Sequence, residues 1–164
     1  MARVSFLDGL RAGLEAVVGG VMVAAVLLNF ANVVARYVFF LPIVAAEEIL
    51  QYMNVWIVVL GLATITRDNR HLQMDVVYQL MSPAVRRAAD VFSTLLELAV
   101  SVYVIVQAGR AMTILQASGQ TSVSAGIPVV LMYAALPIGF GCSALFILAR
   151  CRKLLRGEDV AAPA

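Results

Sequence analysis

The sequence contains few charged residues: only 13% of its 164 residues are Asp, Glu, Lys or Arg, against about 25% in soluble domains. Apolar residues make up 62% of the chain, more than the roughly 45–50% of soluble domains, and the mean hydropathy is +0.93. These values exclude an ordinary soluble domain and predict an integral membrane protein. The formal net charge is only +2, and we expect no nucleic-acid partner.

Residues that carry chemistry are also scarce. His71 is the single histidine, so the chain lacks the pair that would hold a haem between its helices. Cys142 and Cys151 form neither a CxxC pair nor a metal-binding spacing, and we interpret them as packed or lipid-facing thiols. No Gly-rich phosphate loop and no Ser-His-Asp set occurs. We therefore expect no enzymatic activity, no cofactor and no metal in this chain.

Long apolar runs dominate what is present. A membrane-crossing helix needs about 20 mostly apolar residues, and the stretches 16–35, 49–66 and 111–149 carry no charge at all. Pro137 lies inside the last run and is expected to kink its helix. The prediction is an all-α, single membrane domain over 1–164 with a polar tail at 157–164. Its four transmembrane helices are expected at about 14–36, 47–66, 88–110 and 127–149.

The basic residues are unevenly placed along these runs. Only Arg36 and Arg110 of the twelve lie on one side of the predicted membrane. The other ten precede the first span, separate the second from the third, or follow the fourth: Arg3, Arg11, Arg67, Arg70, Arg86, Arg87, Arg150, Arg152, Lys153 and Arg156. The positive-inside rule then places both termini in the cytoplasm. The loops at 37–46 and 111–126 are expected to face outward.

The N-terminal residues allow two interpretations. Phe6, Leu7, Leu10 and Leu14 share one helical face, which favours a short interfacial helix running into the first span. A disordered basic start is the alternative, and the sequence does not decide between them.

Polar residues concentrate around the first two spans. Asn32 and Arg36 lie four residues apart and share a helix face. The adjacent acids Glu47 and Glu48 open the second span, and a short connection would let Arg36 approach one of them. Tyr52 and Trp56 follow Glu48 at intervals of four, which gives one stripe along the helix.

The second span continues into another polar group. Arg67, His71 and Asp75 also recur every four residues. They form a polar stripe if the helix continues, in which case His71 bridges a cation and a carboxylate. An ordinary turn with Asn69 ending the helix is the alternative.

Three residues within the apolar spans also stand out. Trp56 lies about 12 Å along the helix from Glu48, so we interpret it as a packing residue inside the membrane. Gly61 is expected to let a neighbouring helix approach closely. Glu97, in the third span, should face the other helices or a partner, because lipid exposure of a carboxylate is costly. Its expected partners are Arg67, His71 or a group on another protein.

The ordered set of polar residues resembles the small membrane subunit of tripartite ATP-independent periplasmic (TRAP) transporters, the DctQ-like family. The resemblance covers roughly residues 29–80, and no single residue of it is diagnostic. The family often has Trp two residues before the acidic pair, where this chain has Ala45. The matching residues, in order, are Asn32, Arg36, Tyr37, Phe39, Glu47, Glu48, Trp56, Gly61, Arg67, His71 and Asp75.

This resemblance implies a role and partners. In such transporters a periplasmic binding protein captures a small organic anion, and a large membrane subunit moves it inward by an elevator motion. A cation gradient, usually of sodium, drives the movement, and sodium is expected to bind the large subunit. The small subunit resembles a fixed scaffold in the bacterial inner membrane, surrounded by lipids. Its polar residues, including Glu48, would then serve assembly or docking, although solvated loop charges are the alternative for Arg36, Glu47 and Glu48.

Two other functions are compatible with a small four-span membrane protein. A stand-alone four-helix proton-coupled exporter needs a membrane-embedded carboxylate, normally in the first span, whereas this chain has only Glu97, in the third. A membrane anchor for a quinone-linked enzyme is disfavoured by the single histidine only if the anchor holds haem.

Overall fold

A computed structural model describes residues 6–67 and 83–155. All regular elements in this part of the chain are helices: α1 (Phe6–Tyr37), α2 (Ala46–Arg67), α4 (Pro83–Ser118), α5 (Val130–Tyr133) and α6 (Ala135–Leu155). Within it, four helical segments are long and apolar enough to cross a membrane: Asp8–Tyr37, Ala46–Thr66, Ala88–Ser118 and Val130–Ala149. The all-helical class and the four potential spans therefore agree with the sequence prediction.

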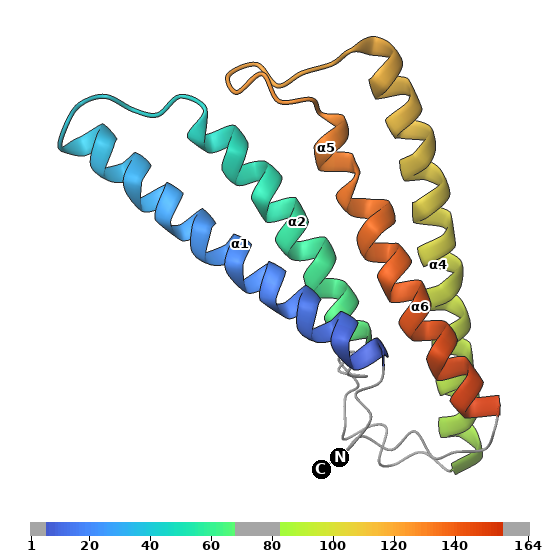
Figure 1. The fold of residues 1–164 in the computed structure, drawn as a ribbon. Helices are drawn as coiled ribbons and strands as arrows, with labels where there is room; N and C mark the ends of the chain where they lie inside the picture. Colours follow the sequence, from blue (N-terminus) through green and yellow to red (C-terminus); the bar gives the residue numbers. More distant parts are fainter. Residues whose placement is uncertain (1–5, 68–82, 156–164) are drawn as a thin grey trace.

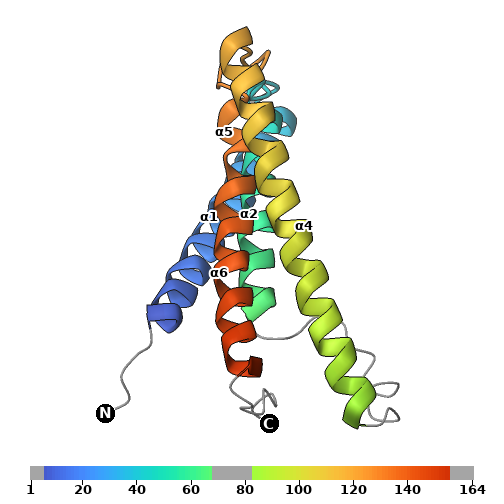
Figure 2. The same ribbon diagram turned by 90° about the vertical axis from the view of Figure 1, so that its right-hand side faces the viewer.

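The long helices form a layer one helix thick. Figure 1 shows them in the spatial order α1, α2, α6, α4, and the contacts between long helices follow that order. The view from the side shows α1 and α4 diverging on opposite sides of α6, so the layer is twisted (Figure 2). The connections 38–45 and 119–129 lie at the same end of the layer, which we call the loop end.

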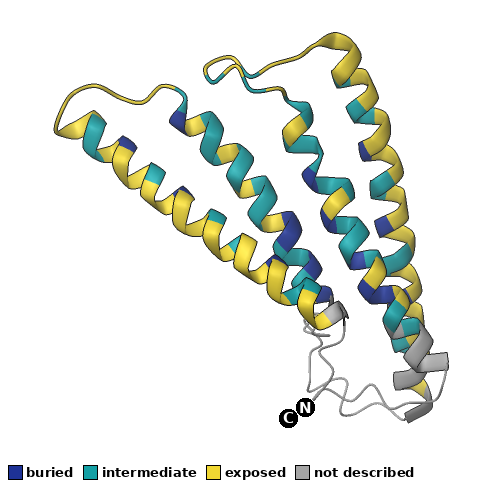
Figure 3. Ribbon diagram, viewed as in Figure 1, coloured by how far each residue is buried: buried dark blue, intermediate teal, exposed yellow. Residues whose placement is uncertain are grey.

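Few residues of this layer are enclosed by the chain itself. Buried residues gather where α1, α2 and α6 converge, and exposed residues prevail along α1 and α4 (Figure 3). The core cluster consists of Leu14, Leu60, Ala63 and Phe146. Buried residues make up only 11% of the most apolar window in α1 and in α4. Such surfaces suit an aliphatic surrounding rather than water, in which exposed apolar area is unfavourable.

Small residues allow α4 and α6 to lie close together. Thr94, Ser101 and Ala108 recur every seven residues on α4 and are all buried. The two hydroxyl groups donate hydrogen bonds to the backbone carbonyls of Asp90 and Glu97, four residues earlier. Their polar atoms are thereby satisfied inside the helix, and small side chains permit close packing between membrane helices.

The last span contains a break of one residue, at which the backbone angles stay close to helical (φ −62°, ψ −24°). Its helix is interrupted at Ala134, between α5 and α6, three residues before Pro137. Proline lacks the N–H that would bond to the carbonyl four residues earlier and crowds that carbonyl, which disfavours continuous α-helix there. The break thus lies in the turn before Pro137, where the kink was expected, and the carbonyl of Leu131 beside it accepts a hydrogen bond from outside the helix.

The N-terminal helix suggested by the sequence is not a separate element. Residues from Phe6 onward are the first turns of α1, which runs without interruption to Tyr37. Arg11 and Glu15 form an ion pair of 2.7 Å on this part of the helix.

Candidate functional site

Polar side chains at the loop end hold the first connection against the helices. The guanidinium of Arg36 lies 2.8 Å from the carboxylate of Glu47, so the predicted approach of Arg36 to one acid is confirmed. Asn32 is buried, and its Oδ1 accepts a hydrogen bond of 3.0 Å from the backbone N–H of Ile43. The end of α1 is therefore joined to the connection 38–45 and to the start of α2.

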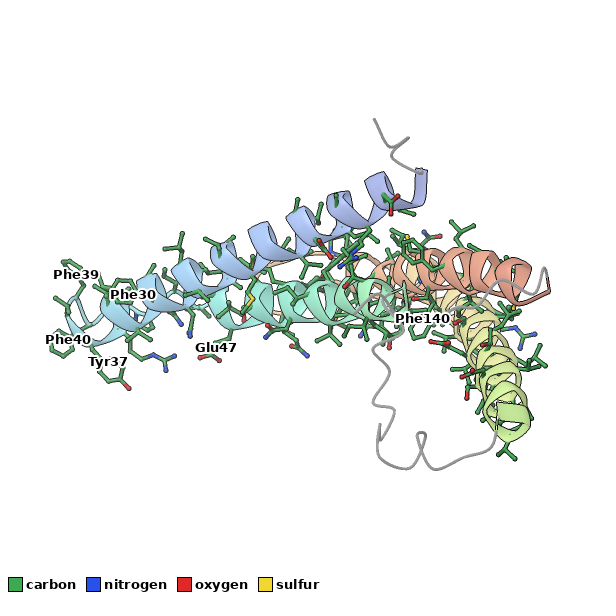
Figure 4. All side chains as sticks on the ribbon, turned by 90° about the horizontal axis from the view of Figure 1, so that it is seen from below. Phe30, Tyr37, Phe39, Phe40, Glu47 and Phe140 are labelled. Atoms are coloured by element: carbon green, nitrogen blue, oxygen red, sulfur yellow. The ribbon has the colours of Figure 1, made fainter. Side chains whose placement is uncertain are left out.

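Aromatic side chains mark the outermost part of this connection. Tyr37, Phe39 and Phe40 project from the end of α1, away from the other helices (Figure 4), and all three are exposed. Tyr is enriched at the boundary between hydrocarbon and water, and the two Phe side chains add apolar surface beside Tyr37. The loop end is thus expected to lie at a membrane surface.

Glu48 makes a different set of contacts from its neighbour. Its carboxylate accepts hydrogen bonds from the backbone N–H groups of Ser124, at 2.9 Å, and of Ala125, at 2.8 Å. The two acids that are adjacent in the sequence therefore have separate partners: Glu47 binds a side chain of α1, and Glu48 binds the connection 119–129.

The connection 119–129 folds back on itself as a small hairpin. The N–H of Ser122 donates to the carbonyl of Ile127, and the N–H of Val129 donates to the carbonyl of Gln120. Gly126 has a φ of +66°, a conformation that residues with a side chain rarely adopt. This turn places the N–H groups of the hairpin tip where Glu48 accepts them.

Glu48 belongs to a stripe on α2 that also includes Tyr52 and Trp56. This stripe continues the contacts with the hairpin from the loop end toward the middle of the helix layer. The hydroxyl of Tyr52 donates to the carbonyl of Ile127 at 3.3 Å, and the indole Nε1 of Trp56 donates to the carbonyl of Leu131 at 3.2 Å. All three side chains of the stripe thus bind backbone groups of one segment, the hairpin and α5. The four-residue spacing revealed the stripe in the sequence, but not its backbone partners.

Trp56 combines this hydrogen bond with packing. Its ring contacts the core cluster of Leu14, Leu60, Ala63 and Phe146, as the packing interpretation expected. The bonded carbonyl belongs to α5, next to the break at Ala134. Side chains of neighbouring helices commonly satisfy carbonyls freed by such a break in a membrane helix.

Among the described residues, the close approach of α2 to another helix lies at Gly139, and the approach expected at Gly61 stays a prediction for a partner helix. A Cβ added to Gly139 would come within 2.7 Å of the carbonyl oxygen of Val59, and would also strike the Val59 side chain. A Cβ added to Gly61 would meet no described atom within 4 Å. Within this chain, Gly139 is therefore the residue that brings α6 against α2, and the Gly-x-Gly pair with Gly141 was its signal in the sequence.

The remaining candidates lie partly outside the described residues. His71 and Asp75 fall in 68–82, and nothing is described of the Arg67 side chain beyond its place in α2. Glu97 is half-buried, and its Oε1 is shielded from solvent. This agrees with the expectation that Glu97 faces other groups rather than the outside, while its predicted pairing with Arg67 or His71 stays a prediction.

The site is built to join segments. Among the described residues, no three His, Cys, Asp or Glu side chains come together in a way that could hold a metal ion. The polar side chains of the loop end instead bind backbone groups or one another, across elements far apart in the sequence. The arrangement defines a class: a multi-span helical membrane protein whose polar site fixes the geometry of one end.

Comparison with known proteins gives the family. Residues 25–157 match the family described as "Tripartite ATP-independent periplasmic transporters, DctQ component". The chain belongs to this family and is the small permease subunit of a TRAP transporter. It is also similar to the "Ectoine TRAP transporter small permease protein TeaB" of Halomonas elongata, with 24% identity over 155 residues, which cover 94% of this chain and 80% of that protein. The family assignment sets aside the stand-alone exporter and the enzyme anchor.

Proposed function

We propose that this subunit is a fixed scaffold for the large, elevator-type membrane subunit of its transporter. The observation that supports the proposal is the one-helix-thick layer, in which most of the apolar surface of α1 and α4 remains uncovered. A helical layer without a second layer must be covered by lipid or by another membrane protein. A broad surface with two accessible faces can offer one to a partner and the other to lipid.

The loop end fits a scaffold in a second respect. Its hydrogen bonds connect α1, α2 and α5 through the Arg36–Glu47 pair, Glu48 and Trp56. These contacts tie both connections to α2, so that the loop end can serve as a stable surface for the periplasmic binding protein. In this proposal both termini are cytoplasmic, as the distribution of basic residues favours.

The proposal places transport chemistry outside this chain. The large subunit would carry a small organic anion inward, driven by a sodium gradient that acts on that subunit. This chain would contribute neither a substrate site nor an ion site. Its localisation would be the bacterial inner membrane, in contact with lipids as well as with the large subunit.

Co-purification and uptake test the proposal together. Affinity-tagged small subunit, co-expressed with the large membrane subunit of the same transporter, should recover that subunit in detergent. Vesicles with both subunits and the binding protein should take up substrate under an inward sodium gradient, and vesicles that lack the small subunit should not. The scaffold role would be refuted if the large subunit does not co-purify and if uptake proceeds in vesicles that lack the small subunit.

A further inference from the structure

One face of α2 carries a regular stripe that none of the other helices covers. The stripe consists of Glu47, Gln51, Asn54, Val58, Gly61 and Ile65. Their spacing alternates between four and three residues, so they form a single line along the helix, in the pattern of a helix-packing seam. We call these six residues the α2 stripe.

The α2 stripe faces away from the contacts that α2 makes within the chain. Helix α2 packs against α1 through Leu60 and Trp56 and against α6 through Val59. On the stripe, Val58 is 67% exposed and Ile65 is 46% exposed. Glu47, at the start of α2 (Figure 4), pairs with Arg36 of α1, but 70% of its side chain stays exposed.

Two members of the α2 stripe are side-chain amides within Ala46–Thr66, a segment long and apolar enough to cross a membrane. Gln51 and Asn54 lie about 7 and 12 Å along the axis from Ala46, at 1.5 Å per residue. Both are exposed, and neither makes a side-chain hydrogen bond to the described residues. They line an open groove together with Glu47 and Val58. Acyl chains offer no hydrogen-bond partner to an amide, so this groove favours a protein occupant over lipid.

Other exposed amides in the apolar helices do not form such a line. Gln107 of α4 donates to the hydroxyl of Tyr103 in its own helix. Asn29 of α1 is exposed, but the amide three residues after it, Asn32, is buried and bonded to the N–H of Ile43. Gln116 is exposed near the loop end of α4, with no other amide of that helix three or four residues away.

We propose that the α2 stripe is the seam that receives a transmembrane helix of the large membrane subunit. The proposal rests on the scaffold function and names the surface that carries it. Gly61 permits the closest approach of the partner backbone, since a Cβ there would meet no described atom. Gln51 and Asn54 donate and accept hydrogen bonds across the seam, as small and polar residues do between membrane helices.

Charge argues against a second copy as the occupant. Two copies in one membrane would share the same orientation, and a two-fold axis along the membrane normal would align their stripes in parallel. Glu47 of one copy would then approach Glu47 of the other. Each of these side chains is 70% exposed even though it pairs with Arg36. A partner helix with a basic or hydrogen-bond-donating residue near that height avoids this repulsion.

Site-specific photo-crosslinking in the assembled transporter tests the seam. p-Benzoylphenylalanine at Val58 should cross-link to the large subunit, whereas the same group at Leu27, which is 62% exposed on α1, should not. Equal cross-linking from both positions, or a product from Val58 that contains only two small subunits or only lipid, would overturn the proposal.

Recovery of the large subunit gives an independent test. Asn54→Leu should lower recovery about threefold, the value expected for one interhelical hydrogen bond, and Gly61→Leu should lower it at least tenfold. The control is Gly20→Leu on α1, an exposed glycine that, like Gly61, has no described atom near an added Cβ, and it should leave recovery unchanged. Undiminished recovery with Asn54→Leu and Gly61→Leu combined refutes the seam alone, whereas failure of the wild-type chain to recover the large subunit refutes the scaffold function.

Discussion

Trp56 binds the backbone of α5 through its indole N–H, which lies 3.2 Å from the carbonyl oxygen of Leu131. The ring of the same residue packs on the core cluster. A single side chain thus supports the core and satisfies a carbonyl beside the break in the last span. These two roles can be separated by substitution.

Trp56→Phe should keep most of the packing and remove the donor. We expect the free energy of unfolding of the purified subunit in detergent to fall by about 1 kcal/mol, a typical net contribution of one hydrogen bond. Tyr37→Phe is the control, because the exposed Tyr37 hydroxyl makes no hydrogen bond to the described residues. Equal thermal stability of the Trp56→Phe variant and the wild type would show that this bond contributes nothing measurable.

The adjacent acids should respond differently to removal. Glu48→Ala deletes the acceptor for the N–H groups of Ser124 and Ala125, so these amides should exchange with deuterium at least tenfold faster. Glu47→Ala is the matched control, since Glu47 binds Arg36 instead. Mass spectrometry of the peptide covering the hairpin measures both variants. Similar acceleration by the two substitutions would contradict the separate roles.

Glu48→Ala should also affect assembly. If the hairpin forms part of the surface that meets the other components, a loosened hairpin should lower recovery of the large subunit or the rate of uptake. Wild-type recovery and wild-type uptake would show that Glu48 only orders the connection 119–129.

Asn32→Leu should destabilise the subunit by about 1–3 kcal/mol, because it leaves the N–H of Ile43 without its acceptor. Asn29→Leu on the same helix changes an exposed amide and should have little effect on the isolated chain. Thermal unfolding in detergent compares the two variants. A larger loss with Asn29→Leu would reverse the assignment.

Gly139→Ala should push α6 away from α2, because the added Cβ would come within 2.7 Å of the Val59 carbonyl oxygen. Overpacking of this kind costs about 1–3 kcal/mol. Gly141→Ala is a close control in the same helix, since a Cβ there would meet nothing within 4 Å. If both alanine variants unfold at the wild-type temperature, the contact between the two helices is looser than described.

Periodicity and charge predicted the helical class and the four apolar segments, because a helix in lipid must satisfy its own backbone. The spacing of Glu48, Tyr52 and Trp56 correctly indicated a shared face. It could not indicate that the partners are backbone groups about 75 residues away, since side-chain spacing contains no information about the carbonyls or amides of another segment.

Packing between helices is where the sequence was least informative. Gly61 and Gly139 both interrupt apolar runs, and only the arrangement of α2 and α6 decides which of them lies at a contact. Pro137 indicated the break at Ala134 in the sequence. The hydrogen bond from Trp56 to the carbonyl of Leu131 could not be predicted, because it depends on the distance between α2 and α5. Residues 68–82, which contain His71 and Asp75, lie outside the described part, so their predicted stripe remains a prediction.

The length of α4 has a consequence for how the subunit sits in a bilayer. Its 36 residues extend about 54 Å, whereas the hydrocarbon core is about 30 Å thick. Even a tilt of about 40°, the upper end for membrane helices, would leave a vertical extent of about 41 Å. At least one end of α4 must therefore extend roughly 5–10 Å beyond the hydrocarbon core, as a helical segment in the headgroup region or in the water beyond it.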